Sequence, residues 1–184
     1  MASGSTDIAD KLIRRFGSLP AVFDAARHSA HLRVPIEVAR WLALLGDALQ
    51  HSLLWRVPEQ IPVGDSSELT DYLTFTQGHA RTERVRVLYL DIKSRLLSDE
   101  ILAEGDVDSA PFSVRDILDR AFALNAGAMV LVHNHPSGDA KPSRADIDLT
   151  RRLALVGREC GISLLDHILL GRGASTSFRS MGLM

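Results

Sequence analysis

The sequence predicts an α/β domain with a mixed β-sheet flanked by helices, preceded by a small helical unit. Residues 1–57 carry apolar side chains at helical spacing. The later part alternates short apolar runs with amphipathic stretches, in the order strand, strand, helix, strand, helix, strand, strand. Between them, "RVPEQIPVGDSS" is rich in turn-forming residues. We therefore divide the chain into a helical unit (1–57), a linker (58–67) and a main domain (68–184).

The helical unit is predicted from two amphipathic stretches, "DIADKLIRRFGSLPAVFDAA" and "PIEVARWLALLGDALQHSLLW". Pro35 suits the first turn of the second stretch, because a backbone N–H in that turn has no intrahelical partner to lose.

The main domain begins with an expected helix over 67–80, started by Ser66 or Ser67. "ERVRVLYLD" alternates like a strand, and "LLSDEILAEGDV" is expected to run back beside it. Two further helices have a Ser cap and end near a Gly, and the run "AMVLV" predicts a buried strand between them. From 83 onward, the expected elements cover residues 83–91, 96–107, 113–127, 128–132, 143–161, 162–171 and 175–182.

The composition excludes several classes of protein. Apolar residues make up 46% of the chain and charged residues 24%, as in a folded globular protein. The net charge of -2 gives no overall basic field, so DNA binding is expected to be weak. Cys160 is the single cysteine, which excludes an intramolecular disulfide and a zinc site with several thiolates. No apolar run approaches the roughly 20 residues that span a bilayer, and no signal peptide is evident, so we expect a cytoplasmic protein without a membrane partner.

The stretch "HNHPSGDAKPSRAD", residues 133–146, carries the strongest chemical signal. If the preceding strand continues through it, His133 and His135 point to the same side with Cα atoms about 7 Å apart. Asp146 falls in the first turn of the next helix, from which its carboxylate can turn back toward the strand end. Two imidazoles and one carboxylate leave a fourth position for water, which is the composition of a catalytic zinc site.

Other interpretations of these residues remain open. Ser143 and Asp146 have the spacing of a helix capping pair, which alone could explain both. A zinc deaminase would need two thiolate ligands, and nucleases with an H-N-H motif spread its residues over a hairpin and a helix. A binding module without activity is the third alternative. Four further histidines, His28, His31, His51 and His79, are expected to be ordinary surface or core residues.

The stretch also resembles the JAMM (MPN+) metalloproteases, whose motif is H-x-H-P-x(6)-S-x-x-D with an upstream glutamate. "HNHPSG", "PSRAD" and "LLDHILLG" are similar to the RadC family, over about residues 66–184. The resemblance implies a JAMM/MPN sandwich related to the cytidine-deaminase architecture. It also implies that His133, His135 and Asp146 bind Zn²⁺ and that Ser143 orients or stabilises the oxyanion.

The resemblance places the catalytic glutamate at the start of a strand before the histidines, where Glu83 stands. Glu100 and Glu104 on the return strand are its competitors. The glutamate would take a proton from the water and pass it to the leaving amine. Asp166 and His167 also match the family, and we expect them to support the ligands, since a ligating histidine usually needs a partner for its other ring nitrogen.

We therefore expect a zinc-dependent hydrolase that cleaves a peptide or isopeptide bond by a zinc-activated water. A DNA-repair-associated protein that binds or processes DNA with the same domain is the alternative. The helical unit resembles a helix-hairpin-helix, but "HLRVPIEVA" lacks the glycine of a phosphate-binding hairpin, so a scaffold is favoured there. A peptide or protein substrate is the expected partner, and a homo-oligomer is compatible with the sequence.

Overall fold

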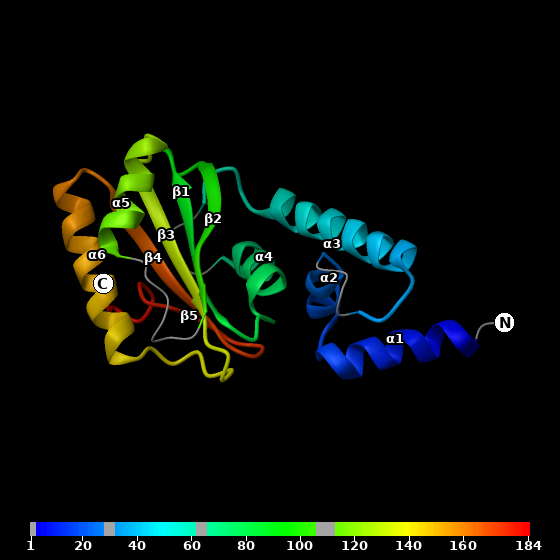
Figure 1. Ribbon diagram of the computed structural model, residues 1–184. Helices are drawn as coiled ribbons and strands as arrows, with labels where there is room; N and C mark the ends of the chain where they lie inside the picture. The colour runs from blue at the N-terminus through cyan, green and yellow to red at the C-terminus, as the bar shows by residue number, and fades with distance from the viewer. Residues whose placement is uncertain (1–2, 28–31, 62–65, 106–112) are drawn as a thin grey trace. The chain divides into compact units, whose positions relative to one another are not determined.

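The computed structural model describes residues 3–27, 32–61, 66–105 and 113–184 (Figure 1). The chain folds into two compact units, Met1–Arg56 and Val57–Met184. His28 and His31, part of the expected linker (62–65) and the end of the expected second strand (106–107) lie outside the described residues. Among the described residues, no helix combines the length and apolar character needed to cross a membrane.

The first unit consists of three helices, α1 (Ser3–Phe16), α2 (Leu19–Arg27) and α3 (Ile36–Arg56). Its small core is formed by Val22, Ala26, Leu32 and Ala39. The predicted stretch 7–26 is divided at Gly17, whose φ of 90° suits glycine and ends α1.

The second unit is built on a five-stranded sheet in the order β2-β1-β3-β4-β5. The β3–β4 pair is parallel and the other pairs are antiparallel, so the sheet is mixed. Helices α5 and α6 cover one face of this sheet, and α4 lies on the other side (Figure 1). The bounds of these elements are α4 (Ser67–Gln77), β1 (Glu83–Leu90), β2 (Leu96–Gly105), α5 (Val114–Ala123), β3 (Ala128–Asn134), α6 (Arg144–Glu159), β4 (Ser163–Leu170) and β5 (Ser175–Ser177).

The main core lies between the sheet and the helices α5 and α6. Val87 of β1 and Leu131 of β3 meet Ile117 of α5 and Leu153 of α6, and all four are buried. Capping boxes start both helices at Ser113 and Ser143. The predicted α/β class with a mixed sheet and flanking helices is confirmed, and it is consistent with a JAB/MPN-like fold.

The predicted last strand, 175–182, is too long, because β5 covers only Ser175–Ser177. The buried carboxylate of Asp166 accepts hydrogen bonds from the Ser177 hydroxyl (2.6 Å) and the Arg179 backbone N–H (3.1 Å). These bonds turn the chain out of the sheet directly after β5. A strand propensity cannot anticipate a turn that is fixed by a side chain of a neighbouring strand.

Candidate metal centre

Strand β3 continues through the two residues after its apolar run, to Asn134. Because side chains alternate along a strand, His133 and Asn134 point to opposite sides. The Asn134 amide accepts a hydrogen bond from the Arg84 N–H (2.9 Å) and donates one to the Thr82 carbonyl (2.9 Å). These two partners flank Glu83 in sequence, so Asn134 fixes the start of β1 next to the end of β3.

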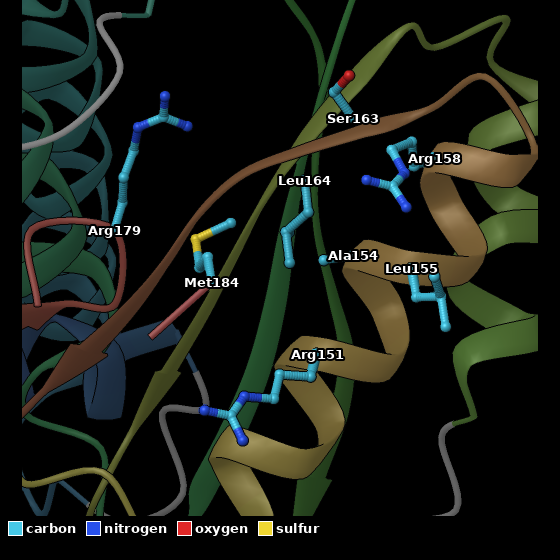
Figure 2. Close-up of a pocket in the computed structure, with 8 residues that line it drawn as sticks. All are labelled: Arg151, Ala154, Leu155, Arg158, Ser163, Leu164, Arg179 and Met184. Atoms are coloured by element: carbon cyan, nitrogen blue, oxygen red, sulfur yellow. The ribbon is translucent and has the colours of Figure 1, made fainter. Parts of the chain in front are cut away.

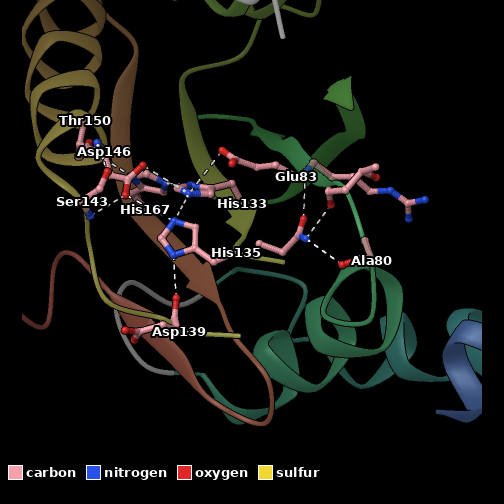
Figure 3. Close-up of polar contacts among 12 residues, drawn as sticks. Ala80, Glu83, His133, His135, Asp139, Ser143, Asp146, Thr150 and His167 are labelled. Carbon is pink, nitrogen blue, oxygen red and sulfur yellow. Dashed lines mark hydrogen bonds and ion pairs between the residues drawn. The ribbon is translucent and has the colours of Figure 1, made fainter. Parts of the chain in front are cut away.

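Three potential metal ligands meet at this end of the sheet (Figure 3). The Nε2 atoms of His133 and His135 are 2.8 Å apart. The Asp146 carboxylate approaches both, with Oδ1 3.4 Å from His133 Nε2 and Oδ2 3.5 Å from His135 Nε2. One ligand atom of each residue lies within 4.8 Å of the other two, so the three can share one ion. The predicted ligands are therefore brought together.

The start of α6 explains how Asp146 reaches the histidines. Ser143 Oγ accepts a hydrogen bond from the Asp146 N–H (3.1 Å), and Asp146 Oδ2 accepts one from the Ser143 N–H (2.7 Å). The capping interpretation of this pair is thus correct, and the same carboxylate also faces the imidazoles. Ser143 itself is exposed, beside the cluster.

A buried hydrogen-bond chain determines which nitrogen of His133 carries the proton. The Thr150 hydroxyl lies 2.5 Å from the Asp146 carbonyl oxygen, which can only accept, so the hydroxyl donates. Its oxygen must then accept from His167 Nδ1 (2.6 Å), which leaves His167 Nε2 as the acceptor for His133 Nδ1 (2.9 Å). His133 Nδ1 therefore holds the proton, and its Nε2 presents a lone pair to the cluster.

The same argument applies to His135. Its Nδ1 lies 2.7 Å from the Asp139 carbonyl oxygen, so Nδ1 donates, and in the neutral ring Nε2 carries the lone pair. Two Nε2 atoms that face each other at 2.8 Å need either a proton or a metal ion between them. Neutral imidazoles oriented by partners on their other nitrogens, together with a carboxylate, form a donor set that fits Zn²⁺.

The pKa values of the buried histidines agree with neutral ligands. Burial lowers the pKa of His133 to about 4, although the nearby Asp146 carboxylate opposes this shift. Burial, reinforced by the neighbouring histidines, lowers the pKa of His167 well below its ordinary value. Both imidazoles are therefore neutral at pH 7. A neutral ring is required of His133 as a candidate metal ligand and of His167 as its hydrogen-bond acceptor.

Glu83 is the one of the three candidate glutamates that lies at the cluster. Its Oε1 is 3.9 Å from His133 Nε2, and burial raises the pKa of its carboxyl group. Glu100 instead forms an ion pair with Arg120 (2.6 Å), and Glu104 lies 3.0 Å from an arginine of β1. These two carboxylates pair with arginines of α5 and β1, respectively, and do not belong to the cluster.

Two contributors to this centre were not predicted from the sequence. Thr150 follows Asp146 by four residues on α6, so it lies on the same face of the helix, and this spacing is the signal that could have found it. Asn134 could have been found from the strand alternation, which turns it away from the two histidines. Asp166, by contrast, binds the C-terminal turn and the His167 backbone N–H (2.7 Å), so its link to the candidate ligands runs through His167.

Comparison with known protein sequences identifies a matching family and two relatives of this chain. A family model described as the RadC-like JAB domain matches residues 63–183. A UPF0758 protein of Rhodobacter capsulatus is 38% identical over 179 residues, which cover 96% of this chain and 84% of that protein. A UPF0758 protein of Ruegeria pomeroyi is 43% identical over 129 residues, which cover 70% of this chain and 58% of that protein.

Proposed function

The chain belongs to the RadC family and carries a JAMM-type domain, and from this premise we propose that it is a zinc-dependent hydrolase of peptide or isopeptide bonds. The observation that carries the proposal is the convergence of the Nε2 atoms of His133 and His135, with the Asp146 carboxylate facing both. These three residues would hold the metal. Zinc, when bound there, supplies Lewis-acid activation of a water molecule and of the substrate carbonyl.

The residues around the ligands supply the proton chemistry. Glu83 is partly shielded from solvent, and its raised pKa brings a carboxylate base closer to neutral pH, where proton transfer is most effective. It would take the proton of the attacking water and deliver it to the leaving amine nitrogen. In the part of the chain that the structure describes, the Ser143 hydroxyl only accepts, so its own proton can be donated to the oxyanion of the tetrahedral intermediate.

The experiment measures zinc content and hydrolysis in the same preparations. Glu83→Gln keeps the size of the side chain and leaves the three ligands intact, so zinc content should equal that of the wild type. Hydrolysis of a library of quenched fluorescent peptides and lysine-isopeptide dipeptides should fall by roughly 10²–10⁴. Glu100→Gln and Glu104→Gln are matched controls, because both carboxylates lie outside the cluster, and they should retain activity.

The outcomes separate the parts of the proposal. Zinc-free wild-type protein after purification and reconstitution would refute the metal assignment. Activity of Glu83→Gln equal to wild type would refute the role of this glutamate. Hydrolysis of DNA but not of any peptide, lost in the same variants, would replace the proposed substrate with a nucleic acid.

A further inference from the structure

A groove of about 580 Å³ lies on the second unit, along α6 and the beginning of β4 (Figure 2). Its volume falls within the range of ligand-binding clefts. Arg151 and Arg158 reach into it from α6, and Arg179 lies on the other side of Met184 (Figure 2). Apolar side chains form its floor, namely Ala154, Leu164 and Met184. The groove therefore combines an apolar base with a cationic rim.

The three arginines have no carboxylate partner within the described part of the chain. Arg151 and Arg158 are exposed, and neither forms an ion pair or a side-chain hydrogen bond there. Within the same described residues, the Arg179 guanidinium donates only to the Leu165 carbonyl oxygen (3.2 Å), while its backbone N–H bonds to Asp166. The C-terminal end of α6 favours a cation at Arg158, but this does not account for Arg151 or Arg179. Three unneutralised guanidinium groups around one groove make it a site for anions.

The strand beside the groove offers backbone groups as well. In the described residues, β5 pairs only with the last three residues of β4, from Ile168 to Leu170. Ser163 and Leu164, which line the groove, therefore have a strand neighbour on the β3 side alone. A strand edge without a second strand is a surface to which an extended peptide can add, and Arg179 already donates to the Leu165 carbonyl at this edge.

We propose that this groove binds an extended acidic peptide segment. An apolar side chain of the peptide would lie on Leu164 and Met184, and flanking carboxylates would pair with the arginines. The site does not rest on the proposed hydrolase function, because none of the metal ligands lines it.

A nucleic acid fits the groove less well than a peptide. Single strands bind by stacking bases on aromatic rings, and none of the residues that line this groove is aromatic. An aliphatic floor of leucine, alanine and methionine instead matches aliphatic side chains. Phosphate contacts alone would not use this floor.

The test is a fluorescence-anisotropy titration of the full chain with labelled hexapeptides. The probe is Glu-Glu-Leu-Leu-Glu-Glu, and its controls replace either the acids with Gln or the two Leu residues with Ser. Labelled oligothymidylate is titrated in parallel. The double variant Arg151→Gln/Arg158→Gln removes two rim charges, and Arg144→Gln/Arg152→Gln removes the same charge from exposed positions of α6 outside the groove.

We expect saturable binding of the acidic leucine peptide, weaker by about tenfold in the groove variant and unchanged in the control variant. Both control peptides should bind more weakly. Equal loss in the two double variants would show attraction by overall charge and overturn the proposal. No saturable peptide binding, or tighter binding of oligothymidylate that is lost in the groove variant, would also overturn it. Melting curves of both variants should match the wild type, since all four arginines are exposed.

Discussion

Thr150→Val tests whether the hydrogen-bond chain behind His133 supports metal binding. Valine keeps the shape of threonine but removes the hydroxyl that donates to Asp146 and accepts from His167 Nδ1. Thr150 and His167 are both fully buried, so no bulk water can replace the hydroxyl. The variant therefore removes one member of the hydrogen-bond chain behind His133, while the three proposed ligands are unchanged.

The magnitude follows from the two states open to His167 in this variant. If His167 keeps its proton on Nδ1, a buried N–H has lost its acceptor, which costs about 1–3 kcal/mol. If the proton moves to Nε2, His133 must accept at Nδ1, and its own proton then occupies the Nε2 that faces the metal position. Metal binding must reverse this shift and restore the unpaired N–H. The affinity should thus fall by about 5- to 150-fold, which agrees with the usual worth of a hydrogen-bond partner behind a ligating histidine.

The assay is a competition titration of Zn²⁺ against a chromophoric chelator, with thermal melting of the metal-free protein measured alongside. Thr150→Ser keeps the hydroxyl and is the matched control, so its affinity should stay within a few-fold of wild type. Unchanged zinc affinity in Thr150→Val, with lowered stability only, would refute the reasoning. The Thr150 hydroxyl would then contribute to packing alone and would have no influence on metal binding at His133.

Three further predictions concern the ligands, pH and an ion pair of the sheet. His133→Ala/His135→Ala should abolish the binding of about one zinc per chain, as measured by metal analysis, and equal zinc content would contradict the site. The pKa values of His133 and His167 lie below those in the unfolded chain, so the unfolded state takes up protons first as pH falls. The free energy of unfolding of the metal-free protein, measured by urea titration, should therefore be highest and constant in its histidine contribution above about pH 6.5. Toward pH 4 it should fall by about 1.4 kcal/mol per pH unit for each histidine. A flat profile would show that neither pKa is lowered. Asp99→Asn should lower the free energy of unfolding by about 3–5 kcal/mol, because it leaves the Arg86 guanidinium, bound at 2.7 Å, buried without its carboxylate; a change below 1 kcal/mol would mean that water reaches the arginine.

Local patterns in the sequence predicted most of the fold. The alternation in "ERVRVLYLD", the apolar run before His133 and the capping pair at Ser143 each carry their signal within a few residues, and each corresponds to an element of the structure. The end of the last strand could not be predicted, since it depends on Asp166, a residue of another strand.

The same distinction holds for the candidate centre. The spacing of His133, His135 and Asp146 is local and was accessible from the sequence. The choice between Glu83 and its competitors depends on which strand register brings a carboxylate to His133, and propensities do not report register. The sequence suggested that His167 has a supporting role, but its link to Thr150 could be seen only in the folded structure.

The pairing of Arg84 with Asn134, and of His133 with His167, joins segments that are distant along the chain. Contacts of this kind form only after large loops have closed, so they appear with the assembled sheet and not in early local structure. An unfolded chain offers a metal little more than the neighbouring pair His133 and His135. Zinc, bound as proposed, should therefore have little effect on the rate of folding and should mainly slow unfolding, which would prolong the lifetime of the folded domain.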